Sequence, residues 1–174
     1  MSDSPTHDLA ARLARGEEAA FAELYDACAD RLHGYLAARL GSRDAASDVL
    51  QSAFLRAVKS RRRFRGVENP VAYMFQIARN EVARLVGKRR VTIKTLPIED
   101  AFFAASENGD DAEAIAAAIA RLDDDDRELV ELKIYAGLTF REIATIVDRP
   151  PATVATRYRR ALESLRQWLV KQFR

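Results

Sequence analysis

The chain has 174 residues, of which 48% are hydrophobic, and its formal net charge is only +2. This size and apolar content suffice for one ordinary domain or two small ones, and bulk charge alone does not indicate a nucleic-acid partner. The single cysteine, Cys28, excludes an internal disulfide and favours an intracellular setting. Neither a leader segment nor an apolar run of membrane-spanning length is visible, so we expect a cytoplasmic protein without membrane insertion.

Alanine and leucine dominate over β-branched residues, which favours an all-α fold. In the N-terminal part, apolar residues recur at three- and four-residue spacing between turn signals. This pattern predicts helices over residues 8–15, 17–40, 44–60 and 70–88. The stretch RRRFRGVENP at 61–70 predicts a basic loop between the last two of them.

The helix predicted over 17–40 carries an apolar stripe typical of a core, composed of Phe21, Leu24, Tyr25, Cys28, Leu32 and Tyr35. Because Cys28 lies within this stripe, we expect a buried side chain there rather than a nucleophile. The helix predicted over 70–88 has a core-facing stripe and, opposite it, a polar and basic stripe formed by Gln76, Asn80, Arg84 and Lys88.

Residues 91–111 lose this periodicity and read as a flexible linker, and helical spacing returns from residue 112. We therefore expect two small helical domains, 1–90 and 112–174, joined by the linker 91–111. Basic residues gather in clusters at 56–65, 88–90 and 157–166, and most acidic residues lie elsewhere. This segregation favours a polyanionic partner.

In the C-terminal part, a helix is predicted over 126–135, with Asp124 or Asp125 as its cap. The run of four aspartates at 123–126 is therefore interpreted as a helix start rather than a metal site. Thr139, followed by Glu142 three residues later, predicts a capping box for the next helix.

Pro150 and Pro151 forbid a continuous helix, so one helix must end near 147–148 and another begin near Pro151. The result is a helix-turn-helix. The start of the last helix turns four polar residues outward, at positions that a recognition helix sends into the major groove: Thr153, Thr156, Arg157 and Arg160. An ordinary helical hairpin with an exposed basic face fits these residues equally well.

The segment EIATIVDRPPATVATRYRRALESLR resembles region 4 of bacterial sigma factors, which reads promoters. The matching residues are Glu142, Ile143, Ala144, Thr153, Val154, Arg157, Arg160 and Ala161. Three positions depart from the usual pattern, with Ala152 in place of Gly, Ala155 in place of Lys and Thr156 in place of Ser.

Two further blocks resemble region 2 of the same family. DVLQSAFLRA at 48–57 is similar to the helix that docks on the polymerase clamp, with Asp48, Gln51, Phe54 and Leu55 matching. AYMFQIARNEVARLVGKRR at 72–90 resembles the promoter-melting helix, with Ile77, Ala78, Arg79 and Asn80 matching and Tyr73-Met74 in place of Trp-Leu. These blocks in this order, with only a linker between them, resemble the extracytoplasmic-function (ECF) group.

The resemblance implies a sigma factor that binds core RNA polymerase through helix 44–60 and directs promoter-specific initiation. It implies reading of a duplex upstream element by Thr153, Thr156, Arg157 and Arg160. A single-stranded downstream element would be held by Arg79, Asn80, Arg84 and Lys88, with Phe64, Tyr73 or Phe75 stacking on a base. The two elements would lie about two helical turns apart, hence ~70 Å, and an anti-sigma factor is implied as a further partner.

We expect neither a catalytic site nor a cofactor or metal, because the sequence has no nucleophile–base set, phosphate-cradling loop or ligand cluster. Two alternatives remain open from the residues themselves. One is a stand-alone helix-turn-helix transcriptional regulator, and the other is a helical adaptor whose basic faces bind an acidic protein. The N-terminal segments DVLQSAFLRA and IARN separate these readings, because a repressor does not need them.

Overall fold

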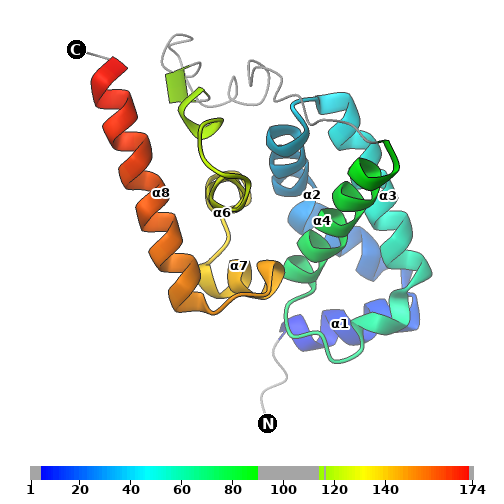
Figure 1. The fold of residues 1–174 in the computed structure, drawn as a ribbon. Coiled ribbons are helices and arrows are strands. Elements are labelled where there is room, and N and C mark those ends of the chain that lie inside the picture. The colour runs from blue at the N-terminus through cyan, green and yellow to red at the C-terminus, as the bar shows by residue number, and fades with distance from the viewer. Residues whose placement is uncertain (1–4, 90–113, 116, 173–174) are drawn as a thin grey trace.

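The computed structural model describes residues 5–89, 114–115 and 117–172, and all the regular elements within these ranges are helices (Figure 1). The α-helices are α1 (Pro5–Arg15), α2 (Glu18–Leu40), α3 (Arg43–Lys59), α4 (Pro70–Arg89), α6 (Asp124–Ile134), α7 (Phe140–Val147) and α8 (Pro151–Gln172). This confirms the all-α fold and the helices expected from the periodicity. The linker predicted over 91–111 lies outside the described residues.

Local capping decides where several of these helices begin and end. The Ser42 hydroxyl accepts a hydrogen bond from the Ala45 amide at the start of α3, and Gly41 closes α2 with a φ of 63°. Thr139 and Glu142 form the predicted capping box of α7. At α6 the prediction was one residue off, because Asp123, rather than Asp124 or Asp125, accepts from the Asp126 amide.

The predicted helix-turn-helix is formed by α7 and α8. Asp148 adopts the left-handed conformation, with a φ of 52°, and its backbone N–H donates to the Ala144 carbonyl. Pro151 is the first residue of α8, where its missing amide hydrogen is not needed. The turn therefore follows the local chemistry of the two prolines.

The segment predicted as a basic loop contains a short 3-10 helix, η1 (Arg61–Phe64). Phe64 is fully buried, and its ring meets those of Phe21 and Tyr73 edge-on, with centroids 6.1 and 5.1 Å apart. This aromatic contact anchors the segment, because the ring edges and faces carry complementary charge.

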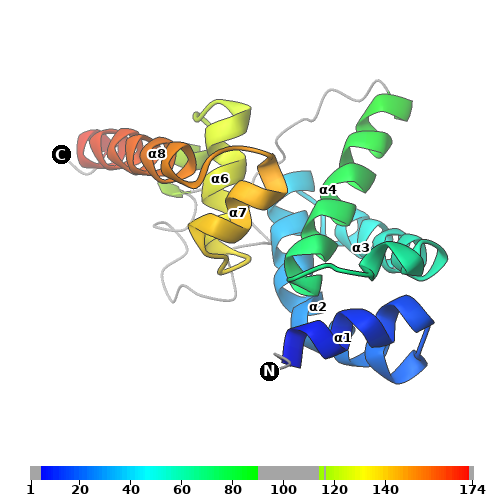
Figure 2. The same ribbon diagram turned by 90° about the horizontal axis from the view of Figure 1, so that it is seen from below.

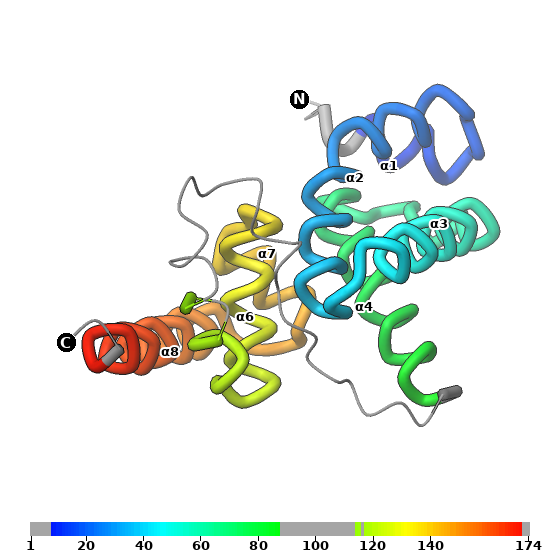
Figure 3. The backbone as a smooth tube through the Cα atoms, turned by 90° about the horizontal axis from the view of Figure 1, so that it is seen from above, coloured from blue at the N-terminus to red at the C-terminus, as the bar shows by residue number. Residues whose placement is uncertain are grey.

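The two helical domains pack against each other. One continuous buried cluster combines Leu24, Leu32 and Met74 with Leu132 and Ile143 of the C-terminal part. Figure 2 shows α6 and α7 lying between α8 on one side and α2 and α4 on the other, and Figure 3 shows α2 between α6 and α3. The two predicted helical domains therefore also share a buried contact with each other.

A second, smaller core lies between α6, α8 and the residues before α6, and it contains Ala118, Ile119, Val130, Ala161 and Leu165. Helix α8 stays at the edge of the molecule (Figure 1) rather than inside it, and most of its described polar side chains are exposed. Leu162 of this helix is also 39% exposed.

Candidate nucleic-acid interface

An open groove of about 650 Å³ lies between helices α2 and α3. Among its lining residues are all four that the sequence proposed for polymerase docking: Asp48, Gln51, Phe54 and Leu55. Tyr25 also lines it and packs against Phe54 with ring centroids 5.0 Å apart. Tyr25 was predicted to be a core residue, but it is 48% exposed, and Leu55 is 55% exposed. A contiguous exposed apolar patch with a polar rim is typical of a protein-binding surface.

A second cavity, of about 500 Å³, lies along α4. Arginines and polar side chains predominate in it, namely Arg56, Arg63, Gln76, Arg79, Asn80 and Arg84. Asn80 and Arg84 are exposed, as a nucleic-acid contact requires, although Arg84 lies 3.6 Å from the Glu81 carboxylate. Lys88 belongs to α4, but its side chain is outside the described part of the structure.

The three aromatic candidates for base stacking differ in burial. Phe64 and Phe75 are fully buried and so cannot stack on a base in this state. Tyr73 is half-buried and lines the α4 cavity beside Asn80. Tyr73 is therefore the stacking candidate that the structure leaves available.

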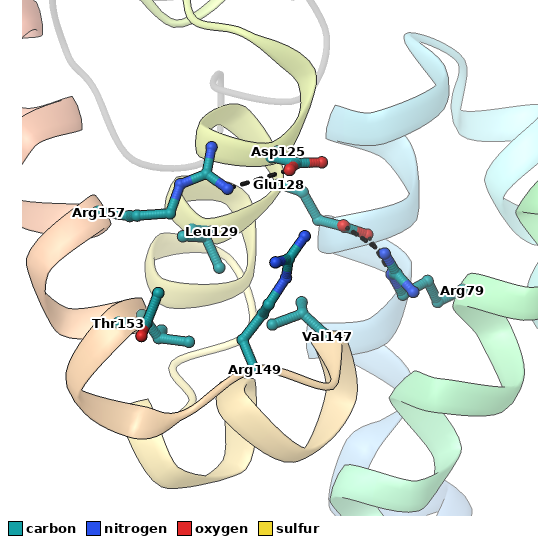
Figure 4. A pocket seen from close by; sticks show the side chains of 9 residues that line it. Arg79, Asp125, Glu128, Leu129, Val147, Arg149, Thr153 and Arg157 are labelled. Carbon is teal, nitrogen blue, oxygen red and sulfur yellow. Dashed lines mark hydrogen bonds and ion pairs between the residues drawn. The ribbon is translucent and has the colours of Figure 1, made fainter.

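Arg79, the central basic residue of the predicted melting helix, is not free. Its Nε and Nη2 atoms donate to the two oxygens of Glu128 on α6, at 2.8 and 3.1 Å (Figure 4). The hydrogen bond to Glu128 outweighs burial and raises the pKa of Arg79. Glu128 is itself buried and also accepts from the Tyr35 hydroxyl at 3.0 Å.

At the start of α8, Thr153, Thr156 and Arg160 are exposed, as predicted for a recognition helix. Arg157 instead donates to Asp126 at 2.7 Å and to Asp125 at 3.0 Å. The hydrogen bond from Arg157 lowers the pKa of Asp125. The aspartate run therefore neutralises one of the four predicted contacts, besides capping α6.

A polar network between α2 and α6 was missed by sequence reasoning. Arg39 donates to Asp124 at 2.6 Å and to Glu131 at 3.4 Å. Glu131 is 2% exposed, and burial raises its pKa to about 7 despite the nearby Arg39. The available signal was that Glu128 and Glu131 share one face of their helix with Leu132 and Tyr135, at three- and four-residue spacing.

The two remaining candidate groups are Cys28 and His33. Cys28 is buried as predicted, and burial raises its pKa to about 12, which keeps the thiol protonated. His33 lies within hydrogen-bonding distance of the Arg43 carbonyl and the Ser47 hydroxyl. Within the described ranges no cluster of three metal-ligating side chains occurs, and no helix is long and apolar enough to cross a membrane.

Comparison with known proteins identifies both halves of the chain. Residues 24–92 match the family model of Sigma-70 region 2, and residues 112–165 match that of Sigma-70 region 4. The RNA polymerase sigma factor CarQ of Myxococcus xanthus is 29% identical, over 91% of this chain and 94% of its own length. The ECF RNA polymerase sigma factor RpoE of Cereibacter sphaeroides is 31% identical, over 87% of each chain.

The fold also has a counterpart among solved structures. The match to the structure of CnrH in complex with the cytosolic domain of CnrY spans 97% of this chain and 99% of the matched chain, with a TM-score of 0.72. The two sequences are 22% identical, so this likeness concerns the fold alone. A similar helical arrangement therefore exists in a solved structure.

Proposed function

The chain belongs to the sigma-70 family of RNA polymerase sigma factors, within its ECF group, and from this premise we propose how its residues divide the work of promoter-specific initiation. The α2–α3 groove binds core RNA polymerase. The α4 cavity holds the melted downstream strand, and the start of α8 reads the upstream element as duplex. A stand-alone regulator or a helical adaptor does not account for the region 2 match.

The observation that carries the polymerase assignment is that all four motif residues of helix α3 line one open groove. Leu55 is the most exposed large apolar side chain there, and Asp48 and Gln51 supply polar groups beside it. Interfaces of this kind have an apolar centre that excludes water and a polar rim that fixes the register. The groove meets both conditions.

The DNA assignment rests on the chemistry of the two basic surfaces. Asn80 can bond to a base edge, Tyr73 can stack on an exposed base, and Arg79 and Arg84 can hold phosphates. On α8, Arg160 and Thr156 are exposed where a recognition helix contacts base edges and phosphates. Lys88 and Thr153 extend these two surfaces, and Arg157 joins the second once it leaves its aspartates.

We assign residues 1–90 to polymerase docking and downstream recognition, and 112–174 to upstream recognition, with 91–111 as the linker. The chain carries no catalysis of its own, since the polymerase supplies the chemistry, and it needs no cofactor. It works in the cytoplasm, and an anti-sigma factor is its expected regulator. These assignments follow from the family and from the chemistry of the described surfaces.

The docking assignment is tested by Leu55→Ala. Truncating a residue that dominates an interface costs about 1–2 kcal/mol or more, so we expect affinity for core polymerase to fall roughly 5–30-fold. Titration of labelled protein with core enzyme measures the affinity, and promoter-directed transcript yield follows it. The matched control is Ile134→Ala on α6, which is 47% exposed but lies outside the groove. Equal behaviour of the two variants would refute the assignment.

A further inference from the structure

One carboxylate joins the basic cluster at 56–65 to the α4 cavity. Helices α3 and α4 pack side by side (Figure 1). Arg56 of α3 donates from its Nε atom to the Oε1 atom of Glu81 on α4, at 2.9 Å. Arg84, three residues after Glu81, places its Nη1 atom 3.6 Å from the same oxygen. Glu81 therefore links two guanidinium groups from different helices, and all three residues line the α4 cavity.

The exposure of the three side chains separates their roles. The Glu81 side chain is 11% exposed, whereas those of Arg56 and Arg84 are 46% and 45% exposed. Among the described residues, neither arginine has a second carboxylate within ion-pair distance. Each guanidinium has five N–H donors, and a contact with one oxygen of Glu81 occupies only a minority of them. Both arginines can therefore bind a ligand in the cavity while they stay bound to Glu81.

Stability does not account for a carboxylate at this place. Ion pairs between half-exposed side chains contribute little to folding, because solvent screens them. A negative charge in the wall of a cavity for nucleic acid also repels phosphates. Holding two long side chains in place works in the opposite direction, because a side chain that is already fixed loses less conformational freedom when its ligand binds.

We propose that Glu81 is a positioning residue, which holds Arg56 and Arg84 as two fixed arms for phosphates of the melted strand. The guanidinium fork suits this task, since one edge bonds a carboxylate while another bonds a phosphate oxygen. Arg56 thereby becomes a strand contact contributed by α3, while Asn80 and Tyr73 of the same cavity contact the bases. The proposal rests on the function assigned above, because it requires the strand to enter the α4 cavity.

Glu81→Gln tests the positioning role, because it removes the charge and nearly keeps the shape of the side chain. Charge alone predicts tighter binding of single-stranded DNA, since a negative charge leaves the cavity. Positioning predicts weaker binding. In ~0.1 M salt one phosphate contact to a single strand is worth about fivefold in affinity, and it adds about 0.7 to the slope of log affinity against log salt. For one to two lost contacts we expect a roughly 5–25-fold loss and a slope shallower by about 0.7–1.4.

The affinity is measured on holoenzyme assembled from the full chain and core polymerase. A fluorescent single-stranded DNA oligonucleotide of mixed sequence is titrated at several salt concentrations, with core enzyme alone as the background. Arg56→Ala and Arg84→Ala should each make the slope shallower by about 0.7, and adding Glu81→Gln to the double variant should cause no further loss. The matched control is Glu23→Gln, which breaks an ion pair of the same kind, with Arg12 at 2.7 Å, outside the cavity.

Glu81→Asp is a second variant, which keeps the charge but shortens the side chain by one methylene group. Positioning predicts weaker binding in this variant too, whereas charge alone predicts no change. Unchanged or higher affinity in both variants overturns the proposal, and so does a lower affinity with an unchanged salt slope, because a general structural defect removes no phosphate contact. Wild-type holoenzyme that binds the oligonucleotide no better than core enzyme alone would instead refute the proposed function, and this inference with it.

Discussion

We call the arrangement in which the two halves pack against each other the closed state, and burial of Glu131 makes this packing depend on pH. Its carboxyl has a pKa of about 7 in the closed chain, mainly because burial disfavours the charged form. Once the halves separate and water reaches the group, its pKa should return towards the ordinary value of 4.5. The charged or titratable groups around it are Tyr35 and Arg39 of α2, Asp124, Arg127 and Glu128 of α6 itself, and Tyr135 just after α6.

The sign follows from proton linkage. A carboxyl whose pKa is raised in the closed state binds a proton more readily there, so low pH favours closure and rising pH opposes it. The difference between a Glu131 pKa of about 7 in the closed state and one of about 4.5 after the halves separate corresponds to a free energy of about 3 kcal/mol. Between about pH 5.5 and pH 8, the free energy of closure therefore changes by about 2 kcal/mol, which is roughly 30-fold in the ratio of closed to open chain.

The assay is energy transfer between two dyes attached to cysteines introduced at the exposed positions Ala83 of α4 and Ser164 of α8. It is followed in the free protein across this pH range. We expect transfer to fall as pH rises, and Glu131→Gln should remove most of the change because an amide does not titrate in this window. A profile that is flat in the wild-type chain, or equally steep in Glu131→Gln, would show that Glu131 does not control the closed state. Circular dichroism over the same range confirms that the helices persist.

The recognition helix, the base pocket and the capping box lead to three further predictions. Arg160→Ala should weaken holoenzyme binding to upstream duplex by about 1–3 kcal/mol if Arg160 bonds a guanine, and gel-shift titration on promoter variants would show discrimination lost at one position only. Tyr73→Ala should weaken open-complex formation, because it removes one stacking contact of ~1–3 kcal/mol, whereas Tyr73→Phe should retain that contact. Permanganate reactivity of the melted bases measures the open complex, and equal loss in both variants would contradict stacking. Thr139→Ala removes the cap of α7 and should cost about 1 kcal/mol of stability, seen as a lower thermal midpoint, while an unchanged midpoint would mean that the capping box is not needed.

Several features of this protein could be predicted from the sequence because they depend on residues a few positions apart. The stripe through Leu24, Cys28 and Leu32, the box formed by Thr139 and Glu142, and the proline turn all involve neighbours within one or two helical turns. Helical spacing and capping chemistry act over this range, so the helices and the helix-turn-helix follow from the sequence. The motif at 48–57 likewise placed its four polymerase candidates on one groove.

What only the tertiary structure decided is which of these faces meet. Tyr25 has the spacing of a core residue and is exposed, whereas Glu128 and Glu131 have the charge of surface residues and are buried. Their environment is set by partners 93 residues away in Tyr35, 92 away in Arg39 and 49 away in Arg79. Such contacts are possible only after two separately patterned helices have docked. The local periodicity of either helix contains no information about that docking, which is why the closed state became visible only in three dimensions.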